Sequence, residues 1–176
     1  MIPAEQAHMH VAASSHSGMS GKNNEDRYAV SAHRISQEKP LPVVFAVVSD
    51  GIGGHRAGEV AAEIAVETIS RVIASSDASQ PVQTLVEAIG QASQAILDQA
   101  EIDTAKTGMG ATCACCCVIQ NQLYTATVGD SRIYLIHNGA IQQISTDHTW
   151  IQEALNAGLL TPEQARRHPH AHVIRR

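Results

Sequence analysis

Two patterns of apolar residues organise the first hundred residues of the chain. Residues 43–48 form an unbroken run of valine, phenylalanine and alanine, which is typical of a strand covered on both faces. Residues 26–35 predict another strand before it. In residues 57–73 the apolar side chains recur at intervals of three and four, and the same spacing follows Pro81. The pattern therefore predicts two strands followed by two amphipathic helices.

The second part of the chain predicts short strands joined by tight turns. The candidates are residues 111–119, 122–128, 132–137 and 140–144. Asn138-Gly139, between the last two, is a strong signal for a type I′ hairpin. Farther on, Thr161, Pro162 and Gln164 supply an N-cap, a first-turn proline and a capping-box glutamine, so a short helix should begin at Pro162. Because strands and helices occur in separate blocks, the predicted fold class is α+β.

Length and charge narrow the class of protein. The 176 residues fit one domain, and we expect a disordered segment at 1–13 and the domain itself at 14–176. A formal net charge of −5 gives no basic groove for a nucleic acid. No window of eighteen apolar residues predicts a membrane span, and the N-terminus does not resemble a signal peptide. We therefore expect a soluble, cytoplasmic monomer with no nucleic-acid or membrane partner.

The cysteines crowd into one predicted strand, at Cys113, Cys115, Cys116 and Cys117. Neighbours this close make poor disulfides, and there is no distant second pair, so reduced thiols are expected. Successive side chains of a strand point to opposite faces, and no second Cys or His pair has zinc-finger spacing. Buried small apolar residues are therefore a better interpretation than a zinc site.

Acidic residues gather where predicted strands begin or end. Asn24-Glu25-Asp26 stands at the start of one strand, and Asp50-Gly51 follows the most apolar one. Carboxylates at such ends can converge on Mg²⁺ or Mn²⁺, which prefer oxygen ligands, and a glycine allows a carbonyl or phosphate oxygen to come close. The alternative for Asp50-Gly51 taken alone is an ordinary turn.

Four motifs occur in a fixed order along the chain. They are Asn24-Glu25-Asp26, Asp50-Gly51-Ile52-Gly53-Gly54-His55, Gly110-Ala111-Thr112 and Gly129-Asp130-Ser131-Arg132. In this combination the chain resembles the bacterial branch of the metal-dependent, type-2C protein serine/threonine phosphatases. The resemblance extends from about residue 17 to residue 169, which is nearly the whole chain.

The resemblance implies a fold and a set of metal ligands. The fold would be two packed antiparallel sheets flanked by helices, with two Mn²⁺ or Mg²⁺ ions in a cleft at one end. By motif position, Asp50 would bridge both ions, Gly51 would offer its carbonyl oxygen, and Glu25 and Asp26 would bind one ion directly or through water. Asp130 resembles the aspartate that holds a third, weaker ion in bacterial members. Its alternative is a turn residue, with Arg132 in a local ion pair.

The resemblance also implies the reaction and the partners. Two cations share a water, lower its pKa and direct it at phosphorus, so hydroxide rather than a side chain is the nucleophile. The substrates would be phosphoserine and phosphothreonine in proteins, the products of a serine/threonine kinase. His55 lies within a motif, and either a general acid or a hydrogen-bonding partner near the phosphate is open for it.

The chain departs from the family pattern at two places. Gly21 stands where these phosphatases usually carry a phosphate-binding arginine, and the adjacent Lys22 is the candidate to supply that charge. The family also places further metal-binding aspartates later, whereas no aspartate follows Asp147. We therefore expect a domain without its C-terminal strands and with low activity. The alternative function is a catalytically inactive module of the same fold that binds phosphoproteins or regulates.

Overall fold

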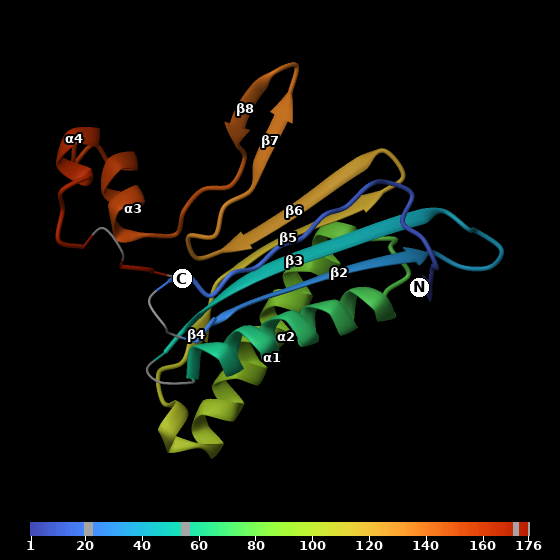
Figure 1. The fold of residues 1–176 in the computed structure, drawn as a ribbon, viewed down its shortest axis with the longest axis horizontal. Helices are drawn as coiled ribbons and strands as arrows, with labels where there is room; N and C mark the ends of the chain where they lie inside the picture. The colour runs from blue at the N-terminus through green and yellow to red at the C-terminus, as the bar shows by residue number, and fades with distance from the viewer. Residues whose placement is uncertain (20–22, 54–56, 171–172, 176) are drawn as a thin grey trace. The chain divides into compact units, whose positions relative to one another are not determined.

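The structure is a computed structural model that describes residues 1–19, 23–53, 57–170 and 173–175. The chain divides into two compact units, Met1–Ala126 and Thr127–Arg176, which we describe separately (Figure 1). Antiparallel strand pairs and helices in both confirm the α+β class. Among the described residues, no helix is both long and apolar enough to span a membrane.

The first unit is built on one antiparallel sheet. Its strands pair in the order β1-β2-β3-β5-β6, and β4 pairs with β3. Their bounds are β1 Ile2–Pro3, β2 Asp26–Arg34, β3 Pro42–Ile52, β4 Gly110–Ala111, β5 Cys113–Ile119 and β6 Gln122–Val128. The four longer strands follow the sequence prediction closely, except that the strand expected at 111–119 is divided into β4 and β5. β4 pairs with the end of β3, and β1 is a short unpredicted strand at the edge of the sheet.

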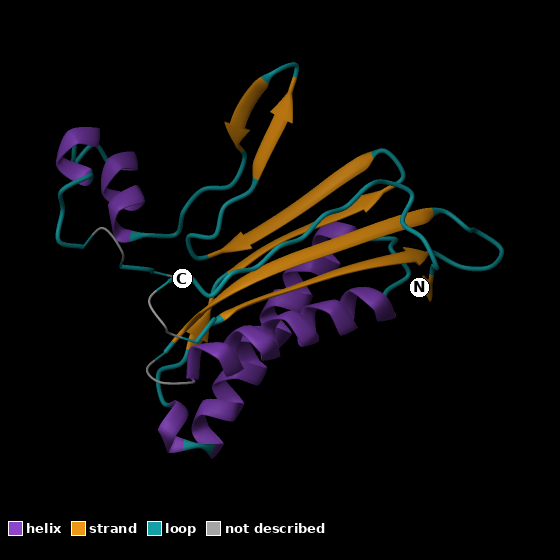
Figure 2. Ribbon diagram, viewed as in Figure 1, coloured by secondary structure: helices purple, strands orange, loops and turns teal. Residues whose placement is uncertain are grey.

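The two faces of β3 differ in their surroundings. Val43, Phe45 and Val47 are at most 1% exposed, because helices α1 (Ala57–Ser75) and α2 (Pro81–Ile102) cover that face of the sheet (Figure 2). On the other face Val44 is buried, but Val48 is 50% exposed. The expectation of a strand covered on both faces is therefore wrong at Val48, where burial comes from the helices on one side only.

The two helices pack closely on each other and on the sheet. α1 contacts α2, β2 and β3, and its buried face is rich in alanine, with Ala57, Ala61 and Ala65 packed near Ile96 of α2 and Met109. Small side chains let helix backbones approach closely, while Ile96 and Met109 fill the remaining space. Both helices match the apolar spacing in the sequence, and Pro81 stands in the first turn of α2 as predicted.

The second unit contains a hairpin and two short helices. Strands β7 (Tyr134–His137) and β8 (Ala140–Gln143) pair antiparallel, and positive φ angles of 49° at Asn138 and 77° at Gly139 confirm the predicted type I′ turn. α3 (Trp150–Asn156) follows, and α4 (Pro162–Ala165) begins at the predicted residue with the capping box of Thr161 and Gln164.

Candidate metal centre at the start of β2 and the end of β3

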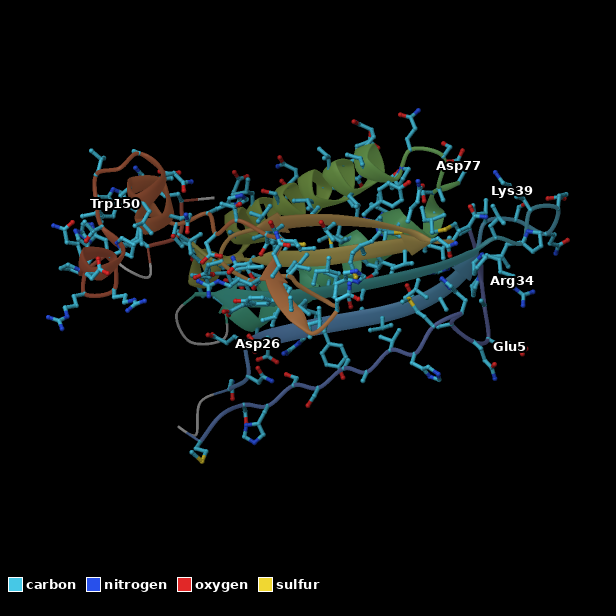
Figure 3. All side chains as sticks on the ribbon, turned by 90° about the horizontal axis from the view of Figure 1, so that it is seen from above. Glu5, Asp26, Arg34, Lys39, Asp77 and Trp150 are labelled. Atoms are coloured by element: carbon cyan, nitrogen blue, oxygen red, sulfur yellow. The ribbon has the colours of Figure 1, made fainter. Side chains whose placement is uncertain are left out.

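Two aspartates face each other across neighbouring strands. Asp26 is the first residue of β2, and its register partner on β3 is Asp50. Both are exposed. Successive side chains of a strand point to opposite faces, and Ser49, which precedes Asp50 on β3, is fully buried. Asp50 and its partner Asp26 therefore lie on the face away from the helices. Asp26 and Arg34 mark opposite ends of β2 in Figure 3. Directly opposed like charges destabilise a strand pair, so this pair suits a bound cation.

Glu25 lies beside this pair, next to the first turn of α1. A Cβ atom added to Gly58 would stand 2.9 Å from the Glu25 Oε1 atom, so the carboxylate lies against the helix backbone. The backbone amide of Gly51 donates a hydrogen bond to the Glu25 carbonyl at 3.2 Å. The positive end of the helix dipole favours a carboxylate at this position.

Gly51 and Gly58 bring β3 and α1 into unusually close approach. A Cβ atom on Gly51 would stand 1.9 Å from the Gly58 carbonyl oxygen, and one on Gly58 would stand 2.7 Å from the Gly51 carbonyl oxygen. Side chains cannot be accommodated at such distances. Only glycine at both places lets the end of β3, the first turn of α1 and Glu25 come together.

Thr112 fixes the backbone of Asp50 from the neighbouring segment. Its side-chain oxygen accepts a hydrogen bond from the Asp50 amide at 2.9 Å, and its own amide donates to the Asp50 carbonyl at 2.8 Å. The Ser49 hydroxyl donates to the Thr112 carbonyl at 2.7 Å. This explains why the third motif, Gly110-Ala111-Thr112, accompanies the second: it anchors the aspartate rather than supplying a ligand.

The oxygen-rich donor set matches a hard cation such as Mg²⁺ or Mn²⁺. It combines two opposed carboxylates, a third carboxylate and the carbonyl of a glycine at which a Cβ would collide. Within the described ranges, however, no three His, Cys, Asp or Glu side chains lie close enough together to hold one ion. Asp26 and Asp50 form the opposed pair of this candidate site, and the Glu25 carboxylate lies toward α1.

Comparison with known proteins decides the family. The sequence profile of the family described as "Protein phosphatase 2C" matches residues 10–154. The chain belongs to the protein phosphatase 2C family.

Known phosphatases resemble this phosphatase 2C chain over most of its length. It is 34% identical over 172 residues to the serine/threonine phosphatase stp of Listeria monocytogenes, covering 96% of the chain and 66% of the relative. The serine/threonine phosphatase structure of S. agalactiae matches with a TM-score of 0.78 and 28% identity, over 90% of the chain and 64% of that structure. The catalytic domain of PstP, solved in complex with two manganese ions, matches with a TM-score of 0.71 and 30% identity, over 84% of the chain and 60% of that structure.

The phosphatase 2C chain thus spans just under two thirds of the length of these relatives. The family that the four motifs indicated is confirmed, as is the α+β fold predicted from the order of strands and helices. The roles of the individual site residues stay predictions.

The predicted site residues fall into three groups in the structure. The backbones of Glu25, Asp26, Asp50 and Gly51 lie side by side at one end of the first unit. Asp130 belongs to the second unit. Lys22 and His55, like Gly21, lie outside the described residues.

Asp130 follows Gly129, whose φ angle of 89° forms the sharp turn predicted after β6. The nearby Arg132 pairs with Asp147, and the hydrogen bonds that Arg132 donates to Asp147 raise the pKa of this guanidinium above its ordinary value. The ion pair of Arg132 therefore joins this turn to a residue 15 positions farther along the chain, and is not the local pair expected within the turn. Asp130, Arg132 and Asp147 help to line a cavity of about 580 Å³ within the second unit.

The cysteines of β5 are packing residues. Cys113, Cys115 and Cys117 are buried, and Cys116 is half-buried. Cys115 and Cys117 are register partners of Val47 and Phe45, so they share the helix-facing side of the sheet, while Cys116 is on the other. Burial raises the pKa of Cys117 from the ordinary 9.0 to about 11, and a hydrogen bond with Cys113, together with burial, raises that of Cys115. Neutral thiols of this kind are poor nucleophiles.

Proposed function

We propose that this chain carries the metal-binding end of a protein serine/threonine phosphatase that hydrolyses phosphoserine and phosphothreonine with a metal-activated water. The observation that supports it best is the direct pairing of Asp26 with Asp50 beside the Gly51 carbonyl. Two opposed carboxylates at an exposed sheet end repel each other, and a bound cation would offset that repulsion. Family membership, and the two manganese ions in the related PstP, support Mn²⁺ or Mg²⁺ as that cation.

Each acidic residue of the site would have a role in metal binding. Asp50 would bridge two ions, with its backbone fixed by Thr112. Gly51 would offer its carbonyl oxygen, and Glu25 and Asp26 would hold one of the ions directly or through water. Asp130 would serve a third, weaker ion. A bound pair of divalent cations supplies a water of lowered pKa and neutralises phosphoryl oxygens.

Lys22 and His55 would contact the substrate rather than the metal ions. Lys22 would bind the substrate phosphate in place of the arginine that Gly21 replaces, although its flexible ammonium lacks the bidentate geometry of a guanidinium. His55 would donate a proton to the leaving group or a hydrogen bond to the phosphate. The substrates would be proteins phosphorylated by a serine/threonine kinase, and the protein would act as a cytoplasmic monomer.

A metal titration tests the proposal directly. Isothermal titration of the chain with Mn²⁺ is compared between the wild type, Asp50→Asn and Asp98→Asn. The control removes one carboxylate charge from α2, where Asp98 accepts a hydrogen bond from Gln94 at 2.7 Å. We expect Asp50→Asn to weaken Mn²⁺ binding by more than about a hundredfold, since loss of a ligand exceeds the tenfold to hundredfold effect of an indirect partner. Asp98→Asn should bind Mn²⁺ as the wild type does.

Turnover is measured alongside, as Mn²⁺-dependent hydrolysis of an aryl phosphate and of a phosphoserine peptide. Hydrolysis that requires Asp50 and Mn²⁺ supports the phosphatase. Peptide binding without hydrolysis at any Mn²⁺ concentration would favour the non-catalytic module. Equal Mn²⁺ affinity in Asp50→Asn and Asp98→Asn would refute the site.

A further inference from the structure

Arg27 binds the turn that carries the acidic residues. It follows Asp26 in β2, and its guanidinium donates hydrogen bonds to the carbonyl of Asn24 at 3.0 Å and to that of Asp26 at 2.8 Å. The same guanidinium forms an ion pair with the carboxylate of Glu59. One side chain therefore joins both ends of the segment Asn24-Glu25-Asp26 to a third residue far away in the sequence.

Glu59 places that third contact in the first turn of α1. The preceding residue is Gly58, the glycine whose backbone touches the Gly51 carbonyl and the Glu25 carboxylate. The ion pair and the glycine contact thus join the same two pieces of chain, the Glu25 turn and the first turn of α1. Both side chains of the pair are mostly covered, with 29% of Arg27 and 33% of Glu59 exposed.

We infer that the Arg27–Glu59 pair is a positioning device for the metal ligands, which holds Glu25 and Asp26 at the correct distance from Asp50 and Gly51. Neither residue is a ligand in this assignment: Arg27 acts through the backbone of the ligand turn, and Glu59 holds Arg27. This inference rests on the proposed metal site, and it adds two residues to those that the four motifs name.

The chemistry of arginine fits this task. Its planar guanidinium has five N–H donors in fixed directions, so it can serve several acceptors at once, whereas a lysine ammonium is a flexible point charge. A partly exposed ion pair contributes little to folding stability by itself, roughly 0–1 kcal/mol. Groups that orient metal ligands typically change metal affinity by about tenfold to a hundredfold. The effect should therefore be larger on Mn²⁺ binding than on stability.

The sign of the effect separates positioning from simple electrostatics. Arg27 carries a positive charge close to a cation site, so its removal would tighten Mn²⁺ binding if only Coulomb repulsion mattered. Loss of positioning has the opposite effect, because the ligand turn is released from α1. The variant Arg27→Met therefore gives opposite shifts in Mn²⁺ affinity under the two explanations.

The experiment measures Mn²⁺ dissociation constants and thermal unfolding for Arg27→Met, Arg27→Lys, Glu59→Gln and the exchanged pair Arg27→Glu/Glu59→Arg. Lys106→Met is the matched control. It breaks the pair of Lys106 with Asp103, which has an N–O distance of 3.0 Å and side chains that are 27% and 39% exposed. That pair belongs to a 3₁₀ turn at the end of α2.

We expect Arg27→Met and Glu59→Gln to raise the Mn²⁺ dissociation constant about tenfold, with Arg27→Lys in between and Lys106→Met unchanged. The exchanged pair can re-form the ion pair, but a carboxylate at position 27 cannot donate to the carbonyls of Asn24 and Asp26. It should therefore bind Mn²⁺ no better than Arg27→Met. Wild-type or tighter Mn²⁺ binding by Arg27→Met would overturn the inference, as would a loss of affinity that only follows a lowered unfolding temperature. Failure of the metal site itself is a separate result, since it appears as unchanged binding in Asp50→Asn.

Discussion

The amide of Asp50 donates a hydrogen bond to the Thr112 hydroxyl oxygen at 2.9 Å, and the amide of Thr112 returns one to the Asp50 carbonyl at 2.8 Å. Thr112 is only 1% exposed, so no water replaces these bonds. The aspartate at the end of β3 is consequently held by a residue 62 positions away in the sequence. Its side chain faces solvent, while its backbone belongs to the rigid interior.

Replacement of this hydroxyl by a methyl group tests the anchor. Thr112→Val keeps the shape of the side chain but leaves the Asp50 amide without its acceptor, which should lower the free energy of unfolding by about 1–3 kcal/mol. Mn²⁺ binding should weaken as well, because Asp50 gains freedom. Urea denaturation and Mn²⁺ titration measure the two effects. Thr112→Ser retains the oxygen and should restore most of the Mn²⁺ affinity; unchanged affinity in Thr112→Val would show that the anchor is not needed.

The close approach of Gly51 and Gly58 predicts a ranking of three alanine substitutions. Gly51→Ala places a methyl 1.9 Å from a backbone oxygen, and Gly58→Ala places one 2.7 Å from another, whereas Gly90 has open space around it. We expect Gly51→Ala to lower the unfolding free energy most, by about 3 kcal/mol or more, with Gly58→Ala intermediate. Gly90→Ala in the middle of α2 should raise it by about 0.5–1 kcal/mol. Thermal unfolding of the three variants gives the order, and a tolerated Gly51→Ala would contradict the contact.

Local sequence patterns were sufficient for most elements of the fold. The spacing of apolar residues gave α1 and α2, and the Asn138-Gly139 pair gave the β7–β8 turn. Each of these signals acts between residues a few positions apart. β1 was not predicted, because Ile2–Pro3 becomes a strand only by pairing with His33 and Arg34. The two residues of β1 contain no sequence signal for this pairing.

In the site, too, local patterns indicated some residues, whereas others depend on contacts between distant parts of the chain. Asp26 and Asp50 could be singled out because acidic residues at strand ends are visible in the sequence, and antiparallel register then brings them together. Arg27 and Glu59 stand outside the four motifs. Their joint role depends on the path of the backbone between β3 and α1, which no local pattern encodes.

The raised pKa of Cys117 predicts a loss of stability at alkaline pH. Burial, followed by the neighbouring Cys116 and Cys115, raises this pKa from the ordinary 9.0 to about 11. Below pH 9 the thiol is protonated in both states. Between pH 9 and about 11 the unfolded chain releases a proton that the folded chain retains, so the unfolding free energy should fall by up to about 1.4 kcal/mol per pH unit.

The measurement is the unfolding free energy from pH 8 to 11 in the wild type and in Cys117→Ala. The variant loses a constant amount from the cavity it creates, but it should also show a shallower decline above pH 9, since this thiol no longer contributes. Parallel curves for the two proteins would contradict the assignment to Cys117.

The Arg132–Asp147 pair should stabilise the second unit far more than the Arg175–Glu153 pair does. The Asp147 side chain is 10% exposed and accepts hydrogen bonds from Arg132 and, at 2.9 Å, from Gln143. Arg132→Met leaves a nearly buried carboxylate without its cation, which should destabilise by about 3 kcal/mol or more. Arg175→Met breaks a pair with Glu153 in which both side chains are about half exposed, so it should change stability by less than about 1 kcal/mol.

Trp150 is the single tryptophan of the chain and lies in this unit, stacked on His168 with ring centroids 4.6 Å apart. Its fluorescence during urea denaturation therefore reports on the unfolding of this unit in both variants. The double variant Arg132→Met/Asp147→Asn removes the uncompensated charge and should recover part of the loss, because the penalty in the single variant comes mainly from the charge left behind. A double variant less stable than Arg132→Met alone would show that Asp147 stabilises the unit independently of Arg132, through Gln143.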